Sequence, residues 1–217
     1  MATNAYSMTF HGDVFDFVNP KPEMFSMETI AHVMFKIPRW NGHLADDFPW
    51  TLGHHSLLVH DLLQKYRPEQ AEFGPEALCH DGSEVLTGDP PGPFKRLLGE
   101  AYKVHERKYD SCMAEQFGLY YPWPRVIKEM DILSQDIEGS MGLRPCPLRD
   151  EHILSPGFVL TDEHKVLVHD VMHKDANDFL NTLKSELTVR WGNTLQMGKP
   201  SSEEPAPARS PAELQSA

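Results

Sequence analysis

The chain has 217 residues, which is enough for one domain with a hydrophobic core. Its 20 basic and 32 acidic side chains give a net charge of −12, which argues against sequence-independent binding to a nucleic acid polymer, because such binding needs a basic surface. The three cysteines lack the spacing of a zinc knuckle, and no apolar run is long enough for a membrane span or a signal peptide. We therefore expect a cytoplasmic protein with reduced cysteines and no contact with membranes.

The first 25 residues are predicted to form an N-terminal arm. Residues 8–17 alternate aromatic and polar side chains around a Gly-Asp pair, which indicates a small hairpin or an extended segment. Ser26 is a suitable N-cap for a helix over residues 27–37, which carries apolar residues at helical spacing and stops before a proline. A second helix is predicted over residues 51–66.

Further helices follow, separated by glycines and prolines that end each helical pattern. They are predicted over residues 75–88, 94–116, 126–141 and 161–191, with a proline-rich loop at 144–157. This nearly complete helical content predicts an all-α fold. We assign residues 26–197 to one domain and residues 198–217, which are rich in Pro, Ser, Ala and Glu, to a disordered tail.

Residues 77–95, ALCHDGSEVLTGDPPGPFK, have an unusual polar content for a helix and the loop after it. On a continuous helix His80 and Glu84 would share one face, because they are four residues apart. Asp81 lies beside them, and the loop adds Asp89 and a lysine. Polar groups among apolar neighbours cost free energy unless something binds them, so the stretch predicts a binding site. Two other His-Asp pairs occur in the chain, and isolated pairs of this kind are mostly surface residues.

The segment from His80 to Lys95 matches every fixed position of the pattern His-Asp-x-x-Glu-x-x-x-x-Asp-x-Pro-x-Pro-x-Lys. It resembles the signature of the HD-domain metal-dependent phosphohydrolases, in the branch that contains bacterial 5′-deoxynucleotidases and phage dATP triphosphohydrolases. The resemblance continues in order from about Glu28 to Glu138. It implies a compact HD-domain bundle of helices around a central divalent metal ion.

The same resemblance implies four metal ligands from three helices. His80 and Asp81 belong to the motif, and His55 lies in LGHHSLLV, where the family has Glu or Gln before the ligand and this chain has another histidine. Asp131 fits a Lys-x-x-Asp pattern with an acidic residue seven positions later, and Asp136 on the same predicted helix is its rival. Two imidazoles and two carboxylates suit zinc, manganese, cobalt, iron or magnesium, so the ligand types leave the metal open.

Glu84 and Asp89 are the catalytic residues that the resemblance implies. In the family, the matching carboxylates orient the attacking water and relay a proton to or from the reacting phosphate. For Asp89, a role as a cap in the loop is the alternative.

Substrate binding in such an acidic chain needs local positive charge. Arg39 can bind phosphate oxygens bidentately, and Lys95 adds a point charge. Trp40 follows Arg39 as in the deoxynucleotidases, where the tryptophan crowds the sugar; ordinary packing is the alternative. His43 stands in a Gly-His pair that resembles the phage branch, which makes it a candidate phosphate contact.

The leading hypothesis is a triphosphohydrolase that prefers dATP and releases deoxynucleoside and triphosphate. The segments PKPEMFSMETIAH and RWNGH resemble the phage branch and favour this activity over that of a 5′-deoxynucleotidase, which releases phosphate from monophosphates. A non-catalytic nucleotide-binding protein with the same fold is a third hypothesis, and it predicts an incomplete ligand set. Relatives are commonly homo-oligomers, so we expect a homo-oligomer, in the host cytoplasm if the protein is phage-encoded.

Overall fold

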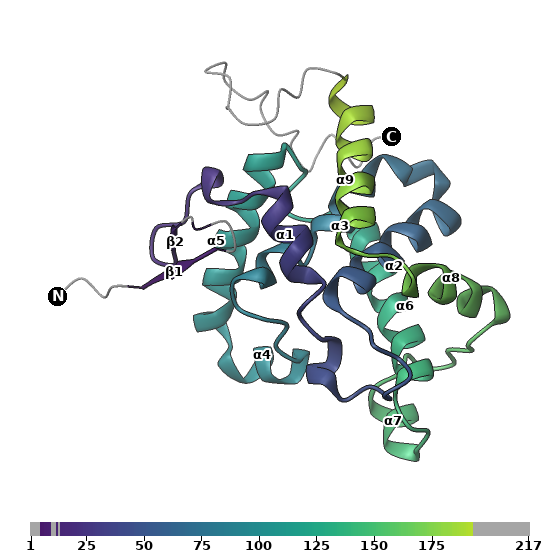
Figure 1. Ribbon diagram of the computed structural model, residues 1–217. Helices are drawn as coiled ribbons and strands as arrows, with labels where there is room; N and C mark the ends of the chain where they lie inside the picture. The colour runs from purple at the N-terminus through teal and green to yellow at the C-terminus, as the bar shows by residue number, and fades with distance from the viewer. Residues whose placement is uncertain (1–4, 10–11, 13, 193–217) are drawn as a thin grey trace.

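The structure is a computed structural model that describes residues 5–9, 12 and 14–192, and the chain folds as an all-α protein with one small hairpin (Figure 1). The predicted tail at 198–217 lies outside the described residues. The α-helices are α1 (Met27–Met34), α2 (Leu52–Tyr66), α3 (Gly74–Cys79), α4 (Gly92–Leu98), α5 (Glu100–Phe117), α6 (Arg125–Gly142), α7 (Pro147–His152), α8 (Asp162–Met172) and α9 (Ala176–Trp191). Short 3-10 helices are η1 (Pro22–Met24), η2 (Arg39–Gly42), η3 (Pro68–Phe73) and η4 (Gly82–Val85).

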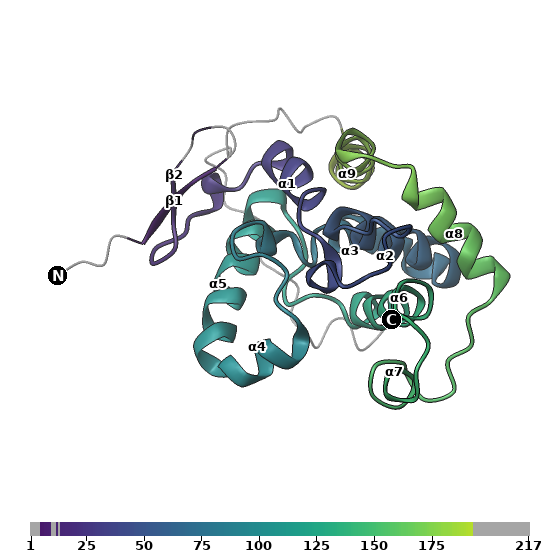
Figure 2. The ribbon, with the colours of Figure 1, turned by 60° about the horizontal axis from the view of Figure 1, so that its bottom comes forward.

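Helix α2 is the central element of the molecule. It packs against α3, α6, α8 and α9, and Figure 2 shows α2 and α3 enclosed between α9 and α6. Its start is defined by a capping box, in which the Thr51 hydroxyl accepts from the His54 N–H and the His54 Nδ1 accepts from the Thr51 N–H. His54 thus takes the place that Glu or Gln usually has in a capping box.

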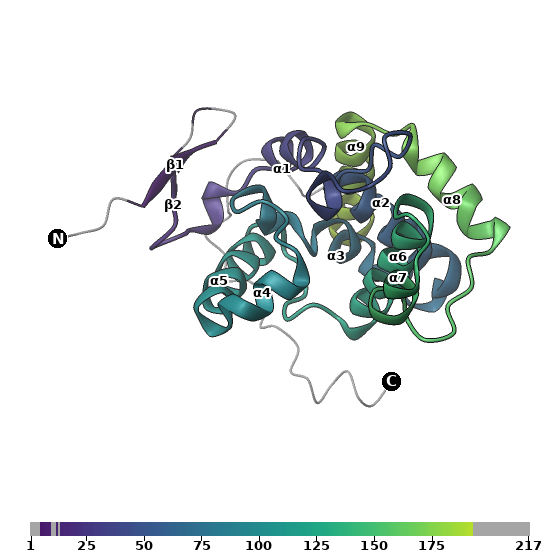
Figure 3. The same cartoon turned by 90° about the horizontal axis from the view of Figure 1, so that it is seen from below.

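The predicted hairpin is present and is attached to the helical core by a phenylalanine. Strand β1 (Tyr6–Met8) pairs antiparallel with β2 (Val14–Asp16). Figure 3 shows the hairpin on the outside of the molecule, beyond α1 and α5. Phe15 is fully buried, and its ring lies 5.5 Å from that of Phe25 and 5.7 Å from that of Tyr109 on α5. The N-terminal arm is therefore part of the core at this position.

Two long predicted helices are each divided in the structure. The helix expected over 94–116 breaks at Gly99, where φ is 60° and ψ is −140°, a combination that residues with a Cβ rarely adopt. The helix expected over 161–191 breaks before Asp175, whose side chain accepts from the N–H groups of Asn177 and Asp178 and so begins α9. The segment predicted as a loop at 144–157 contains the short helix α7, and the first predicted helix ends at Met34. None of the described helices is both long and apolar enough to cross a membrane.

Candidate metal centre

The motif helix predicted over 75–88 ends at Cys79, and the chain bends through His80 and Asp81 into η4. The Nδ1–H of His80 donates to the carbonyl oxygen of Ala77 at 2.9 Å, which in a continuing α-helix would accept the N–H of Asp81. Asp81 then has φ −106° and ψ 11°, outside the helical region. The predicted shared helical face of His80 and Glu84 is therefore wrong, because the helix does not continue between them.

Side-chain atoms of the four predicted ligands converge between α2, this bend and α6. The Nε2 of His55 lies 3.3 Å from the Nε2 of His80 and 3.3 Å from the Oδ1 of Asp131, while the Oδ2 of Asp81 lies 3.5 Å from both imidazole Nε2 atoms. Ligands about 2.1 Å from a tetrahedral ion are about 3.4 Å apart. The buried His55-His80-Asp131 cluster could therefore hold a metal ion.

Hydrogen bonds on the far side of each imidazole direct its Nε2 into the cluster. The Nδ1 of His55 lies 2.6 Å from the Oε1 of Glu138 and 3.1 Å from the Oγ of Ser134. The Nδ1 of His80 is held by the carbonyl of Ala77 described above. A partner at Nδ1 fixes the ring orientation of a metal-binding histidine and raises its basicity, so these contacts suit a metal centre.

The carboxylates around His55 keep this imidazole protonated without a metal ion. Burial lowers the pKa of His55 and Arg39 opposes its charge, but Glu138 and Asp131 outweigh both and raise the pKa to about 10. Burial raises the pKa of Glu138, but Arg39 and His55 lower it to about 2. A metal ion at Nε2 of His55 would therefore replace a proton, and its binding would strengthen as the pH rises.

Of the two carboxylates considered on α6, Asp131 faces the cluster. Its Oδ1 also accepts from the Gln135 amide at 2.6 Å, and the Nζ of Lys128 lies 2.5 Å from its Oδ2. Asp136 instead accepts from the backbone N–H of Ser155 at 2.7 Å. Asp136 therefore holds the segment after α7 in place and does not join the cluster.

Sequence reasoning missed the residues of α6 that orient the ligands. Glu138 entered only as part of a pattern, and Ser134 and Gln135 were not considered. Ser134, Gln135 and Glu138 lie three, four and seven positions after Asp131. The four residues therefore share one face of α6. That helical spacing was the signal that could have identified them.

Arg39 is buried between two carboxylates. Its Nη1 lies 2.7 Å from the Oδ2 of Asp89 and its Nε lies 3.3 Å from the Oε2 of Glu138, which also accepts from the Trp40 Nε1 at 2.9 Å. Trp40 and Asn41 have φ of 54° and 52°, a left-handed conformation that costs about 1–3 kcal/mol for each residue with a side chain. The bonds to Glu138 hold this strained turn against the His55-His80-Asp131 cluster.

Glu84 has one oxygen in an ion pair and one without a partner. It is 3% exposed; its Oε1 is bonded to the ammonium of Lys95, and its Oε2 is buried with no hydrogen-bond partner among the described residues. Burial and the charges of Asp81 and Asp89 raise the pKa of Glu84 despite the ion pair with Lys95. The Oε2 of Glu84 is thus able to accept a hydrogen bond from a bound water or ligand.

His43 lies apart from this cluster. It is exposed and lines a separate cavity of about 420 Å³ with Asp46 and Arg144. Its backbone N–H donates to the carbonyl of Trp40 at 3.0 Å, so it is joined to the strained turn through the main chain.

Comparisons with known proteins add relatives whose names state no activity. No family model matches the chain. The chain is 32% identical over 139 residues to the uncharacterized protein RCAP_rcc00048 of Rhodobacter capsulatus, an alignment that covers 62% of this chain and 71% of the relative. It is 30% identical over 129 residues to the uncharacterized protein YfdR of Escherichia coli, covering 59% of this chain and 67% of the relative.

Proposed function

This chain belongs to the family of RCAP_rcc00048 and YfdR, and neither of these names states an activity. From the chain's own residues, we propose that it catalyses the metal-dependent hydrolysis of deoxynucleotides. The observation that carries the proposal is the convergence of His55, His80 and Asp131, in which the buried carboxylate of Glu138 orients the imidazole of His55 from behind. Asp81 lies against both imidazoles and completes the ligand set in this proposal. On an ion with six-coordinate geometry, these four ligands leave positions for water and substrate.

The residues around the cluster have defined roles in this reaction. A divalent ion held there would bind a phosphoryl oxygen and lower the pKa of a water. As the water oxygen bonds to phosphorus and the bond from phosphorus to the leaving oxygen breaks, Glu84 takes a proton of the water at Oε2 and then gives this proton to the leaving oxygen. Lys95 stabilises the carboxylate of Glu84 before it accepts the proton and after it releases it, and Asp89 is positioned by Arg39.

Our preferred substrate is dATP, cleaved to deoxyadenosine and triphosphate. The support is the resemblance of RWNGH and its lead-in to the phage branch, together with a tryptophan whose indole is tied to the centre through Glu138. In this proposal Arg39, Trp40 and Lys95 lie next to the substrate, and His43, which lines a separate cavity, is joined to them through its main-chain bond to Trp40. The protein would act in the cytoplasm as a homo-oligomer.

A substrate panel tests the proposal. Protein stripped with a chelator is assayed with added Mn²⁺, Co²⁺, Zn²⁺ or Mg²⁺ against the dNTPs, ATP and dAMP, and the products are separated by ion-exchange chromatography. We expect metal-dependent release of deoxyadenosine and tripolyphosphate from dATP. Orthophosphate released from dAMP alone would instead support a 5′-deoxynucleotidase. Metal binding with no hydrolysis of any nucleotide would contradict the proposal and favour a non-catalytic binding protein.

Two matched variants on α6 control the panel. Asp131→Asn should lower activity by more than about 100-fold, because even the loss of a partner behind a ligand costs 10–100-fold. Asp136→Asn changes an equally buried carboxylate on the same helix and should keep both metal and activity. Equal activities of the two variants would remove Asp131 from the metal centre.

A further inference from the structure

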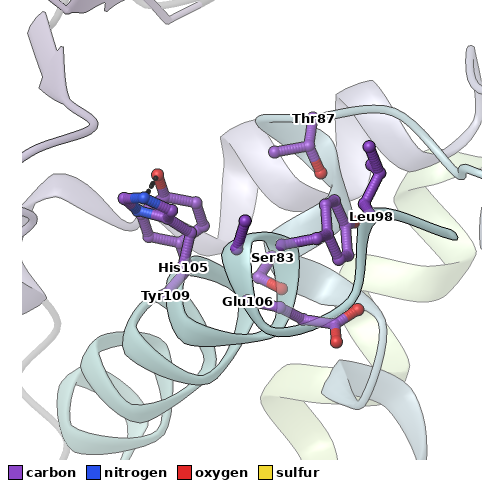
Figure 4. A pocket seen from close by; sticks show the side chains of 8 residues that line it. Ser83, Thr87, Leu98, His105, Glu106 and Tyr109 are labelled. Carbon is purple, nitrogen blue, oxygen red and sulfur yellow. Dashed lines mark hydrogen bonds between the residues drawn. The ribbon is translucent and has the colours of Figure 1, made fainter. Parts of the chain in front are cut away.

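A cavity of about 350 Å³ lies between η4 and the turn from α4 to α5 (Figure 4). Its walls are mostly apolar and include the rings of Tyr102, His105 and Tyr109 on α5. Ser83 and Glu106 contribute polar groups to the lining. This volume is within the range of roughly 300–1,000 Å³ that is typical of small-molecule sites.

The cavity is next to the candidate metal centre. Two connections show this, one along the main chain and one through the side chain of Lys95. Ser83 follows Asp81 by two residues, so their Cα atoms are at most about 7 Å apart. The ammonium of Lys95 is bonded to Glu84 on one side and lies 2.9 Å from the Oε1 of Glu106 on the other. The same ammonium lies 5.6 Å from the centre of the Tyr102 ring, so one lysine contacts both the catalytic carboxylate and the cavity wall.

The chemistry of the walls suits a flat heteroaromatic ring. Aromatic side chains stack on the faces of nucleobases, and the apolar lining favours removal of these faces from water. At the polar end, the carboxylate of Glu106 accepts hydrogen bonds and donates none. It can therefore bind an amino group on the edge of a base but repels a carbonyl oxygen in the same place.

We propose that this cavity binds the base of the nucleotide and that Glu106 selects bases with an exocyclic amino group. The assignment rests on the proposed function, since it places the phosphates at the metal centre and the base on the other side of Lys95. With this assignment, the expected substrates are nucleotides of adenine, cytosine or guanine. Nucleotides of thymine and hypoxanthine are expected to bind less tightly.

Binding of nucleosides tests the cavity without phosphate or metal. Deoxyadenosine and deoxyinosine are titrated into metal-free protein by calorimetry. At the base edge the first has an amino group beside a bare N1, and the second has a carbonyl beside an N1–H. We expect deoxyadenosine to bind at least about tenfold more tightly, a difference of about 1.4 kcal/mol, which a hydrogen bond to a charged group can supply. Equal affinities would overturn the role of Glu106, and no saturable binding of either nucleoside would overturn the whole assignment.

Variants place the binding in this cavity. Tyr102→Ala should weaken deoxyadenosine binding by about 10- to 100-fold, the usual effect of removing a stacked ring, whereas Tyr102→Phe should keep it. Tyr6→Ala, on the exposed strand β1, is the control. Glu106→Gln should abolish the preference for deoxyadenosine, and Glu100→Gln on the exposed face of α5 should not. Binding unchanged in Tyr102→Ala would overturn the assignment.

Hydrolysis assays separate this inference from the proposed function. If Tyr102→Ala raises the KM for dATP and leaves kcat unchanged, the cavity assignment and the proposed function are both supported. If dATP is hydrolysed but its KM does not change in Tyr102→Ala, the cavity assignment fails and the hydrolase remains. If no nucleotide is hydrolysed while nucleoside binding still depends on Tyr102, the cavity assignment stands and the proposed function fails.

Discussion

Glu138 connects His55, a candidate metal ligand, with the strained turn at Trp40. It is fully buried, and its two oxygens contact the Nδ1 of His55, the Nε of Arg39 and the indole of Trp40. A buried carboxylate is stable only when paired and hydrogen-bonded, and these three partners meet that need. The orientation of a candidate metal ligand and the conformation of the turn at Trp40 therefore depend on one side chain.

Asp81 and Glu84 are three residues apart but should respond differently to mutation. Asp81→Ala removes a carboxylate that contacts both imidazoles, so we expect metal affinity and activity to be lost together. Glu84→Ala leaves those contacts intact and removes a proton acceptor, so metal binding should persist while kcat falls about 10²–10⁴-fold. Calorimetric metal titration and steady-state assays on both variants measure the difference. Full activity in Glu84→Ala would remove this residue from the mechanism.

At the scale of the elements, the ligands are carried by helices that other helices hold in place. Helix α3, which leads into the His80-Asp81 bend, is joined to α9 by an ion pair in which Glu76 is fully buried. Both oxygens of Glu76 accept from the guanidinium of Arg190, at 2.5 and 2.7 Å, and one also accepts from the N–H of Tyr120 at 2.8 Å. The position of the bend thus depends on a residue near the end of the described chain.

Arg190→Met should lower the free energy of unfolding by about 3–5 kcal/mol, because it leaves the charge of Glu76 buried without a partner. The matched control is Lys184→Met on the same helix. Lys184 pairs with Glu28 at 3.1 Å, and both side chains are substantially exposed, so the change should cost less than about 1 kcal/mol. Urea denaturation followed by circular dichroism measures both variants. Similar losses in the two would show that the buried pair is not the main tie between α3 and α9.

The stability of the whole molecule depends on pH because the chain carries an excess of negative charge. Asp110 is a buried carboxyl group that contributes to this pH dependence. It is 7% exposed and accepts from the Ser83 hydroxyl at 2.5 Å. Burial, with the charges of Glu106 and Asp81, raises its pKa to about 7 although the Ser83 bond opposes the shift. In the unfolded chain an aspartate has a pKa of about 3.9. Between these values the folded state binds more protons, so its stability falls as the pH rises from about 4 to about 7.

Asp110→Asn should remove this loss, because an amide has no charge to bury. We expect the free energy of unfolding of the variant, relative to the native sequence, to increase by about 2 to 3 kcal/mol between about pH 5 and pH 8. Denaturation in the presence of a chelator measures it, since a metal ion would alter the charge near Asp81. Asp162→Asn, at a carboxylate that is 95% exposed, should show no such increase. A difference that stays constant with pH would mean that Asp110 is ionised throughout.

Local chemistry in the sequence determined the all-α class, the N-terminal hairpin and most helix starts. Ser26 caps α1 as predicted, and glycines and prolines separate the later helices. The breaks at Gly99 and Asp175 also had local signals, namely a residue without a Cβ and a good N-cap. These features could be predicted because each depends on residues within a few positions of one another.

Only the tertiary structure decided how distant residues meet. His55 and Asp131 are separated along the chain by α3, α4 and α5, and their 3.3 Å approach depends on how α2 packs against α6. The same packing directs Asp131 rather than Asp136 to the cluster and buries Arg39 between two carboxylates. Spacing along a helix tells which residues share a face, but the partner of that face is set by the packing of the whole core.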